Sequence, residues 1–272
     1  DTVYIGGGSL IQDKLGIGLV TGVLSFFLQM VILSKILSNN VKTLPIGADK
    51  LTTKTGMLYA KIATRMLGQI NLRDEESKNN VSNWTSTTKI NIYADPAYLL
   101  AIQDYTPQKK KILISLVFEN IEFDTLKAVN DSIVQAFESR KDDLFYISME
   151  KRENDELSLY RRLGITESKI LTPSNIQEAT IAIRNSELLI AMRLHALILG
   201  HGHTTLLGIS RTTKTSAFCK EGNVPYFDLD HIPNNLAKVI SKMTIRSLAD
   251  FELQKEAASK KIKLANSFFN DN

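Results

Sequence analysis

The segment IAMRLHALILG, residues 190–200, places an arginine and a histidine directly after an apolar run. The guanidinium of Arg193 presents a planar fork of donors that matches a carboxylate or a phosphate. The imidazole of His195 can give or take a proton near neutral pH. On an extended segment, residues two apart face the same side, so both side chains could act on one ligand. The alternative is an arginine in a structural ion pair and a histidine that caps the next helix.

Two further cations stand where strands are expected to end. Arg73 lies in NLRDEES, residues 71–77, ahead of three carboxylates that suit a helix N-terminus, where the helix dipole favours anions. Arg73 itself either pairs with a neighbouring acid or binds an anionic ligand. Lys214 lies in GISRTTKTSAF, residues 208–218, at the expected start of a helix, where a positive charge is unfavourable. Lys214 therefore either binds a ligand or is an ordinary surface lysine.

A glycine-rich turn follows the first expected strand. Gly7, Gly8 and Ser9 belong to the stretch GGGS, whose backbone N–H groups could hold a phosphate or simply form a tight turn. The stretch is not a dinucleotide-binding fingerprint, because Leu10 and Ile11 occupy the later glycine positions. It also lacks the Lys-Ser/Thr pair of a P-loop. We retain Gly7, Gly8 and Ser9 as candidate substrate-binding residues.

No metal site is predicted. His201 and His203 form a His-Gly-His pair, but no third ligand stands at a recognisable spacing and no cysteine cluster supports the pair. We therefore interpret both histidines as loop residues.

The charge balance excludes one broad class of function. The chain has 33 basic and 29 acidic residues, a formal net charge of +4. This excess is too small to indicate the basic face that nucleic-acid binding requires, so we expect no nucleic-acid partner. Cys219 is the single cysteine, which excludes an internal disulfide and is compatible with a reducing compartment.

Short apolar runs alternate with helical patterns along almost the whole chain, which predicts α/β architecture with parallel sheets covered by helices. We expect two doubly wound, Rossmann-like domains, with the first incomplete at its start. The predicted domains are 1–106 and 107–272, joined near DYTPQKKK, and the last helix is expected to pack back on the first domain. In such sheets ligands bind outside the carboxyl ends of the strands, where Arg73, Arg193 and His195 are expected.

One uncharged stretch is long enough to be considered as a transmembrane helix. Residues 15–34 contain no charge, and twenty apolar residues would cross a bilayer. Glycine, threonine, serine and glutamine dilute this stretch, which favours a helix buried in the α/β domain over a transmembrane helix.

Taken together, several segments resemble the polysaccharide pyruvyl transferase family. The matching segments, in the family's order, are YIGGGSLIQD (4–13), PIGADKL (45–51), INLRDEES (70–77), YADPA (93–97), IAMRLHALILG (190–200) and GISRTTKTSAF (208–218). The most specific among them are the Arg-Asp-Glu-Glu-Ser and Arg-Leu-His-Ala stretches.

The resemblance implies a fold of the GT-B type, with an acceptor-side first domain and a donor-side second domain. It implies transfer of the pyruvyl group of phosphoenolpyruvate (PEP) onto two hydroxyls of a cell-surface polysaccharide or its precursor, with formation of a cyclic ketal. It further implies that Arg73, Arg193 and Lys214 bind PEP and that His195 is catalytic. No cofactor and no metal are required. The expected location is cytoplasmic, with peripheral association at the inner face of the membrane where the acceptor is lipid-linked.

Two other functions stay open at this point. A GT-B-like glycosyltransferase that uses a nucleotide sugar would share the fold and a basic site. A non-catalytic relative could bind a glycan or associate with a membrane. The first hypothesis requires Arg73, Arg193 and His195 to converge on one small, doubly charged molecule between the two domains.

Overall fold

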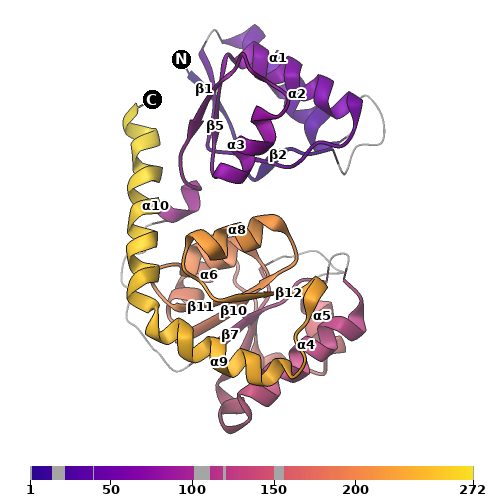
Figure 1. The fold of residues 1–272 in the computed structure, drawn as a ribbon, viewed down its shortest axis with the longest axis vertical. Helices are drawn as coiled ribbons and strands as arrows, with labels where there is room; N and C mark the ends of the chain where they lie inside the picture. Colours follow the sequence, from indigo (N-terminus) through magenta and orange to yellow (C-terminus); the bar gives the residue numbers. More distant parts are fainter. Residues whose placement is uncertain are drawn as a thin grey trace. The chain divides into compact units, whose positions relative to one another are not determined.

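The computed structural model describes residues 2–13, 22–38, 40–100, 111–118, 121–149 and 156–271. The chain divides into two compact units: unit 1 comprises Asp1–Leu99 and Lys261–Asn272, and unit 2 comprises Leu100–Lys260. The predicted boundary at 106/107 and most of the predicted linker fall within 101–110, outside the described residues. Each unit is an α/β structure with parallel strands, so the predicted fold class is confirmed (Figure 1).

Unit 1 is built on short parallel strands with helices between them. Its strands are β1 (Thr2–Ile5), β2 (Ser9–Ile11), β3 (Asn40–Thr43), β4 (Gly47–Ala48), β5 (Gln69–Leu72) and β6 (Lys89–Ile92). Its helices are α1 (Val23–Leu37), α2 (Lys54–Leu67), α3 (Glu75–Ser82) and the 3-10 helix η1 (Pro96–Leu99). Strand β1 pairs with β3, β2 with β4 and β5 with β6, all in parallel. A parallel bridge joins Ile46, directly before β4, to Leu72 at the end of β5. Because the paired strands are parallel, the carboxyl ends within each pair lie at the same edge.

Local sequence signals set the limits of the unit 1 helices. Helix α2 begins at the N-cap Thr53, whose side chain accepts a hydrogen bond from the Gly56 N–H, and ends at Gly68 with φ of 75°. Asp74 caps α3 by accepting from the Ser77 N–H at 2.6 Å. The expectation that the acids of NLRDEES form a helix N-terminus is therefore confirmed.

Within the uncharged stretch 15–34, the structure describes the part from Gly22 onward, which enters α1. One side of α1 carries Leu24, Phe27 and Val31 into the core of unit 1. In the part of the chain that the structure describes, no helix combines the length and the apolar character that crossing a bilayer requires.

Unit 2 contains a six-stranded parallel sheet in the order β12-β11-β10-β7-β8-β9. The strands are β7 (Ile112–Ser115), β8 (Leu144–Ile147), β9 (Ile170–Leu171), β10 (Leu188–Ala191), β11 (Thr205–Ser210) and β12 (Tyr226–Asp228). The chain starts in the centre at β7, builds outward to β9, and returns to the other side of β7 with β10. This is the doubly wound order, and its topological switch point lies between β7 and β10.

Helices cover both faces of the unit 2 sheet (Figure 1). They are α4 (Phe123–Ala136), α5 (Glu156–Arg162), α6 (Ile176–Arg184), α7 (Leu194–Gly200), α8 (Thr213–Glu221), α9 (Leu236–Ala249) and the 3-10 helices η2 (Glu138–Asp143), η3 (Glu167–Lys169) and η4 (Leu229–His231). The central strands β7 and β10 are fully buried, as their near-continuous apolar sequences predict.

The last helix, α10 (Phe251–Asp271), contributes residues to both units. Near its end, the ring of Phe268 lies edge-on to Tyr93 and Tyr4, with centroid separations of 5.1 and 6.2 Å. Phe268 is 1% exposed, so its ring is buried against these two tyrosines of unit 1.

Candidate active site

Arg193 and His195 lie at the switch point of the unit 2 sheet. Strand β10 ends at Ala191, and the Met192 N–H donates to the Ser115 carbonyl of β7 at 2.9 Å. Arg193 is the N-cap residue of α7, and His195 is an exposed residue in its first turn. The carboxyl ends of β7 and β10 are where a doubly wound sheet binds its ligand.

The prediction that extended backbone aligns Arg193 with His195 is wrong. The helix begins at Leu194, so the two side chains leave the chain on either side of a strand-to-helix transition. Both still lie at the same edge of the sheet, but helix geometry, not strand alternation, sets the direction of His195.

Arg193 forms an ion pair with Glu156, the first residue of α5. The Nε of Arg193 donates to Oε1 of Glu156, whose side chain is 1% exposed, whereas that of Arg193 is 27% exposed. The Met149 N–H donates to the other carboxylate oxygen at 2.5 Å. A buried carboxylate needs such partners, because an isolated buried charge is very costly. The structural ion pair that the sequence left open is therefore present.

Tyr160 connects the strand ends that lie beside this ion pair. Its hydroxyl donates to the Ile147 carbonyl at 2.9 Å and accepts from the Leu116 N–H at 3.1 Å. Burial, together with the negative charge of Glu156, raises the pKa of Tyr160 well above its ordinary value, so the phenol stays protonated. Tyr160 thus fixes the backbone beyond β7 and β8.

Lys214 lies at the next strand end along the same edge. Strand β11 pairs in parallel with β10, and α8 follows it with Thr212 as the N-cap. Lys214 is the second residue of α8 and is half-buried. Three predicted residues of unit 2, Arg193, His195 and Lys214, therefore come from the carboxyl ends of adjacent strands.

Arg73 is the centre of a separate polar cluster in unit 1. Its Nη1 donates to Oδ2 of Asp95 at 3.1 Å, its Nη2 donates to Oγ of Ser9 at 3.3 Å, and its Nε lies 3.4 Å from Oδ2 of Asp74. Arg73 is 7% exposed. The structure thus shows Arg73 paired with acids, which is one of the two alternatives that the sequence left open. Four chain segments meet around it, which contain Ser9, Gly47, Arg73 with Asp74, and Asp95.

Gly47 comes from the fourth chain segment of this cluster and allows the close approach of Ser9 and Arg73. An added Cβ would lie 2.5 Å from Oγ of Ser9 and 3.0 Å from Nη2 of Arg73. The Gly47 N–H donates to the Gly8 carbonyl at 2.9 Å, which ties the glycine turn to β4.

Gly47→Ala is expected to lower the free energy of unfolding by about 1–3 kcal/mol, because the methyl group overpacks a site filled by Ser9 and Arg73. Denaturant unfolding measures the loss. Ser9→Ala removes the atom at 2.5 Å, so the double variant Ser9→Ala/Gly47→Ala should recover part of it. A Gly47→Ala protein as stable as the wild type would contradict the packing.

Gly7 and Gly8 form the turn that the sequence predicts. Their φ angles are 113° and 62°, a region that favours glycine. A Cβ at either residue would meet no atom within 4 Å, so the turn is open on its outer side. The backbone geometry thus leaves room for a ligand, and Ser9 directly after it contacts Arg73.

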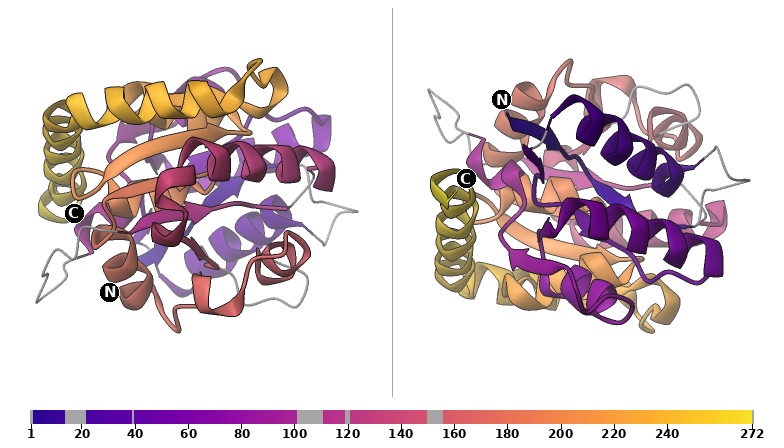
Figure 2. Two further views of the ribbon diagram at one scale, coloured as in Figure 1. Left: turned by 90° about the horizontal axis from the view of Figure 1, so that it is seen from below. Right: turned by 90° about the horizontal axis from the view of Figure 1, so that it is seen from above.

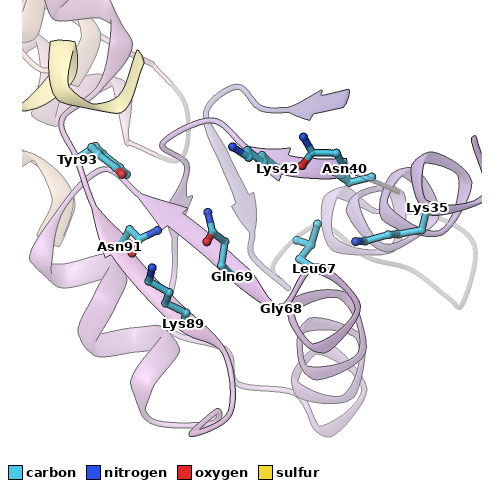
Figure 3. A pocket seen from close by; sticks show the side chains of 10 residues that line it. Lys35, Asn40, Lys42, Leu67, Gly68, Gln69, Lys89, Asn91 and Tyr93 are labelled. Carbon is cyan, nitrogen blue, oxygen red and sulfur yellow. The ribbon is translucent and has the colours of Figure 1, made fainter. Parts of the chain in front are cut away.

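A separate polar pocket of about 690 Å³ lies on the face of the unit 1 sheet that carries Lys42, Gln69 and Asn91 (Figure 3). The core of the unit includes Ile70, which alternates with Gln69 along β5 and so points to the other face. The pocket is lined by Lys35, Asn40, Val41, Lys42, Leu67, Gly68, Gln69, Lys89, Asn91 and Tyr93. None of the residues predicted for the active site lines it.

Among the described residues, no group of histidine, cysteine and acidic side chains could hold a metal ion. His201 is 1% exposed and its Nε2 lies 3.1 Å from the Gly222 carbonyl. For His203, burial and the positive charge of Arg184 lower the pKa to about 4.

The shift at His203 predicts a pH effect on stability. Its pKa falls from an ordinary 6.5 to about 4 on folding, so the unfolded chain binds the proton more tightly. The stabilisation by neutral His203 is complete above pH 6.5 and is lost as the pH falls toward 4. Between pH 7 and pH 5, the free energy of unfolding measured with urea should therefore fall more for the wild type than for His203→Asn. Equal falls in the free energy of unfolding of both proteins would contradict the lowered pKa of His203.

Two acids of these clusters, Asp95 and Glu156, were not predicted from the sequence. Asp95 lies in the quoted YADPA stretch, whose position after a strand was its only signal. Glu156 lies 37 residues from its partner Arg193, and no spacing rule connects them.

The fold is of the GT-B type, because solved structures of GT-B glycosyltransferases and epimerases are similar to it over most of the chain. A UDP-GlcNAc 2-epimerase from Methanocaldococcus jannaschii, in complex with UDP-GlcNAc and UDP, has a TM-score of 0.57 at 13% identity over 91% of this chain and 69% of that one. A Listeria monocytogenes protein described as a UDP-N-acetylglucosamine 2-epimerase has a TM-score of 0.56 at 11% identity, covering 97% and 91%. WaaG, a glycosyltransferase of lipopolysaccharide biosynthesis, has a TM-score of 0.52 at 12% identity, covering 89% and 80%.

The family model of polysaccharide pyruvyl transferase matches residues 1–205. The chain therefore belongs to the polysaccharide pyruvyl transferase family, and the predicted resemblance is confirmed. The match includes Arg73, Arg193 and His195, whereas Lys214 lies beyond it. No curated protein sequence matches the chain.

Proposed function

We propose that this protein transfers the pyruvyl group of PEP onto two hydroxyls of a sugar in a cell-surface polysaccharide or its precursor. The single observation that carries the proposal is the placement of Arg193 and His195 at the switch point of unit 2, within the segment that the family model matches. A cation and a proton-transfer group at the ligand-binding edge of the sheet are what PEP chemistry needs.

The reaction forms two C–O bonds and breaks one. One sugar hydroxyl adds to C2 of PEP while C3 accepts a proton and becomes a methyl group. The second hydroxyl then displaces phosphate from C2, and its proton leaves with the phosphate. The products are a cyclic ketal that keeps the carboxylate and one inorganic phosphate.

Each candidate residue has a role in this scheme. His195 is proposed as the general acid or base, since it is exposed at the start of α7. Arg193 and Lys214 are proposed to bind the phosphate and carboxylate of PEP, and Gly7, Gly8 and Ser9 to bind substrate. Glu156 holds one edge of the Arg193 guanidinium and so positions it.

Arg73 contributes in a different way. Its contacts with Ser9, Asp74 and Asp95 make it a positioning residue that holds the glycine turn to the ends of β5 and β6. Direct binding of PEP by Arg73 requires the substrate to compete with two carboxylates, and it stays a prediction.

The test is incubation of the protein with PEP and candidate glycans, with phosphate release and the mass of the glycan followed together. The proposal expects both to rise in parallel, one phosphate per ketal. Phosphate release without a modified glycan would indicate hydrolysis of PEP, and no reaction with any glycan in the presence of bound PEP would reject the transfer.

A second candidate is a glycosyltransferase that uses a nucleotide sugar. The observation in its favour is the likeness of the fold to WaaG, at a level of identity that concerns the fold alone. Transfer of a sugar from a UDP-sugar, with release of UDP, would support this candidate.

A further inference from the structure

Helix α1 exposes an apolar side in addition to the one it buries. Phe26, Leu33, Ile36 and Leu37 are 59%, 53%, 75% and 75% exposed, and Ile32 is 40% exposed. They recur at intervals of three, four and seven residues, so they lie along one outward side of the helix. Exposed apolar side chains gathered in this way mark interaction surfaces.

Helix α2 extends this surface. It packs beside α1 (Figures 1 and 2), and Leu58, Ile62 and Met66 follow one another at intervals of four with exposures of 54%, 39% and 37%. Gly56, Ala60 and Ala63 are buried on the opposite side of α2. We call the outward sides of the two helices the α1–α2 face.

The charges on both helices have one sign. The exposed cations of α2 are Lys54, Lys61 and Arg65, and α1 adds the half-buried Lys35. Neither helix contains an aspartate or a glutamate. An apolar strip accompanied only by cations is complementary to an anionic surface that also offers an apolar interior.

The same charges argue against a second copy of this chain as the occupant. A two-fold symmetric dimer through this face would bring the cations of both copies into one interface with no acid on either helix to pair with them, and like charges in an interface are unfavourable.

We propose that the α1–α2 face docks on the surface of an anionic lipid bilayer. The apolar side chains enter the boundary between headgroups and acyl chains, and Lys54, Lys61 and Arg65 lie against the lipid phosphates. This inference goes beyond the proposed function and does not depend on it, because docking requires none of the residues assigned to PEP.

The experiment is flotation of the purified chain with vesicles of phosphatidylglycerol and phosphatidylcholine in equal parts, and with vesicles of phosphatidylcholine alone. Wild type should float with the anionic vesicles, less so at high salt, and poorly with neutral ones. The double variant Ile36→Asn/Leu37→Asn should bind the anionic vesicles at least about tenfold more weakly, because two apolar side chains that would be buried in the bilayer are replaced by polar ones. Lys61→Gln/Arg65→Gln should lose the preference for anionic lipid.

Ile245→Asn is the matched control, because Ile245 is 69% exposed on α9, outside the α1–α2 face. It should float like the wild type, and equal melting temperatures should show that all the variants are folded. Failure of the wild type to float, or equal loss in Ile245→Asn, would overturn the proposal. So would a wild-type dimer that Ile36→Asn/Leu37→Asn converts to a monomer, because a second copy would then cover the face.

Discussion

His195→Ala is expected to lower PEP-dependent phosphate release by about 10²- to 10⁴-fold, the range typical for loss of a general acid or base. His195 is exposed in the first turn of α7, so its replacement removes little packing and the protein should keep its melting temperature. Binding of PEP should change much less than turnover, because the proposed cations stay in place. Steady-state phosphate release and PEP binding by calorimetry measure the two quantities separately.

His231→Ala is the matched control for this prediction. His231 is also an exposed histidine of unit 2, at the end of η4, and has no assigned role. It should turn over PEP at the wild-type rate. Wild-type turnover by His195→Ala, or the same loss in both variants, would show that His195 does not transfer the proton.

Arg193→Met is expected to cost about 3 kcal/mol of the free energy of unfolding, because it leaves the carboxylate of Glu156, 1% exposed, without its cation. It should also weaken PEP binding if the remaining guanidinium nitrogens bind the substrate. Denaturant unfolding and PEP titration measure these two effects. The first effect is structural and the second concerns the ligand, and one substitution alone cannot separate them.

The double variant Arg193→Met/Glu156→Gln separates the two roles. It removes the buried charge together with its partner, so stability should return toward the wild-type value while PEP binding stays weak. The control Arg161→Met breaks an exposed pair with Glu167 and should cost at most about 1 kcal/mol. Recovery of PEP binding along with stability would mean that Arg193 is only a partner for Glu156.

Local signals in the sequence were sufficient to predict most of the fold. Asn175 at the start of α6 and Gly164 after α5 lie at the limits expected from capping rules, with Gly164 at a φ of 78°. Continuous apolar runs such as the one before Arg193 predicted buried parallel strands. These features depend on neighbours within a few residues, which is why they can be read from one sequence.

The contacts of the candidate site could not be predicted in the same way. Arg73 meets Ser9, 64 residues away, and Asp95, 22 residues away, and Arg193 meets Glu156 across 37 residues. Such contacts follow from the order of strands in a sheet and not from periodicity. The start of α7 at Leu194 agrees with the helix expected from LHALILGHG, and the error was to treat Arg193 and His195 as parts of one extended segment although the helix begins between them.

Direct binding of the donor is the measurement that tests the central claim, that the strand ends of unit 2 recognise PEP. Isothermal titration of the wild type with PEP and, separately, with UDP-GlcNAc compares the donors of the two candidate reactions. We expect saturable binding of PEP that Arg193→Met/Glu156→Gln weakens, with no binding of UDP-GlcNAc. Saturable binding of UDP-GlcNAc with none of PEP would contradict the claim.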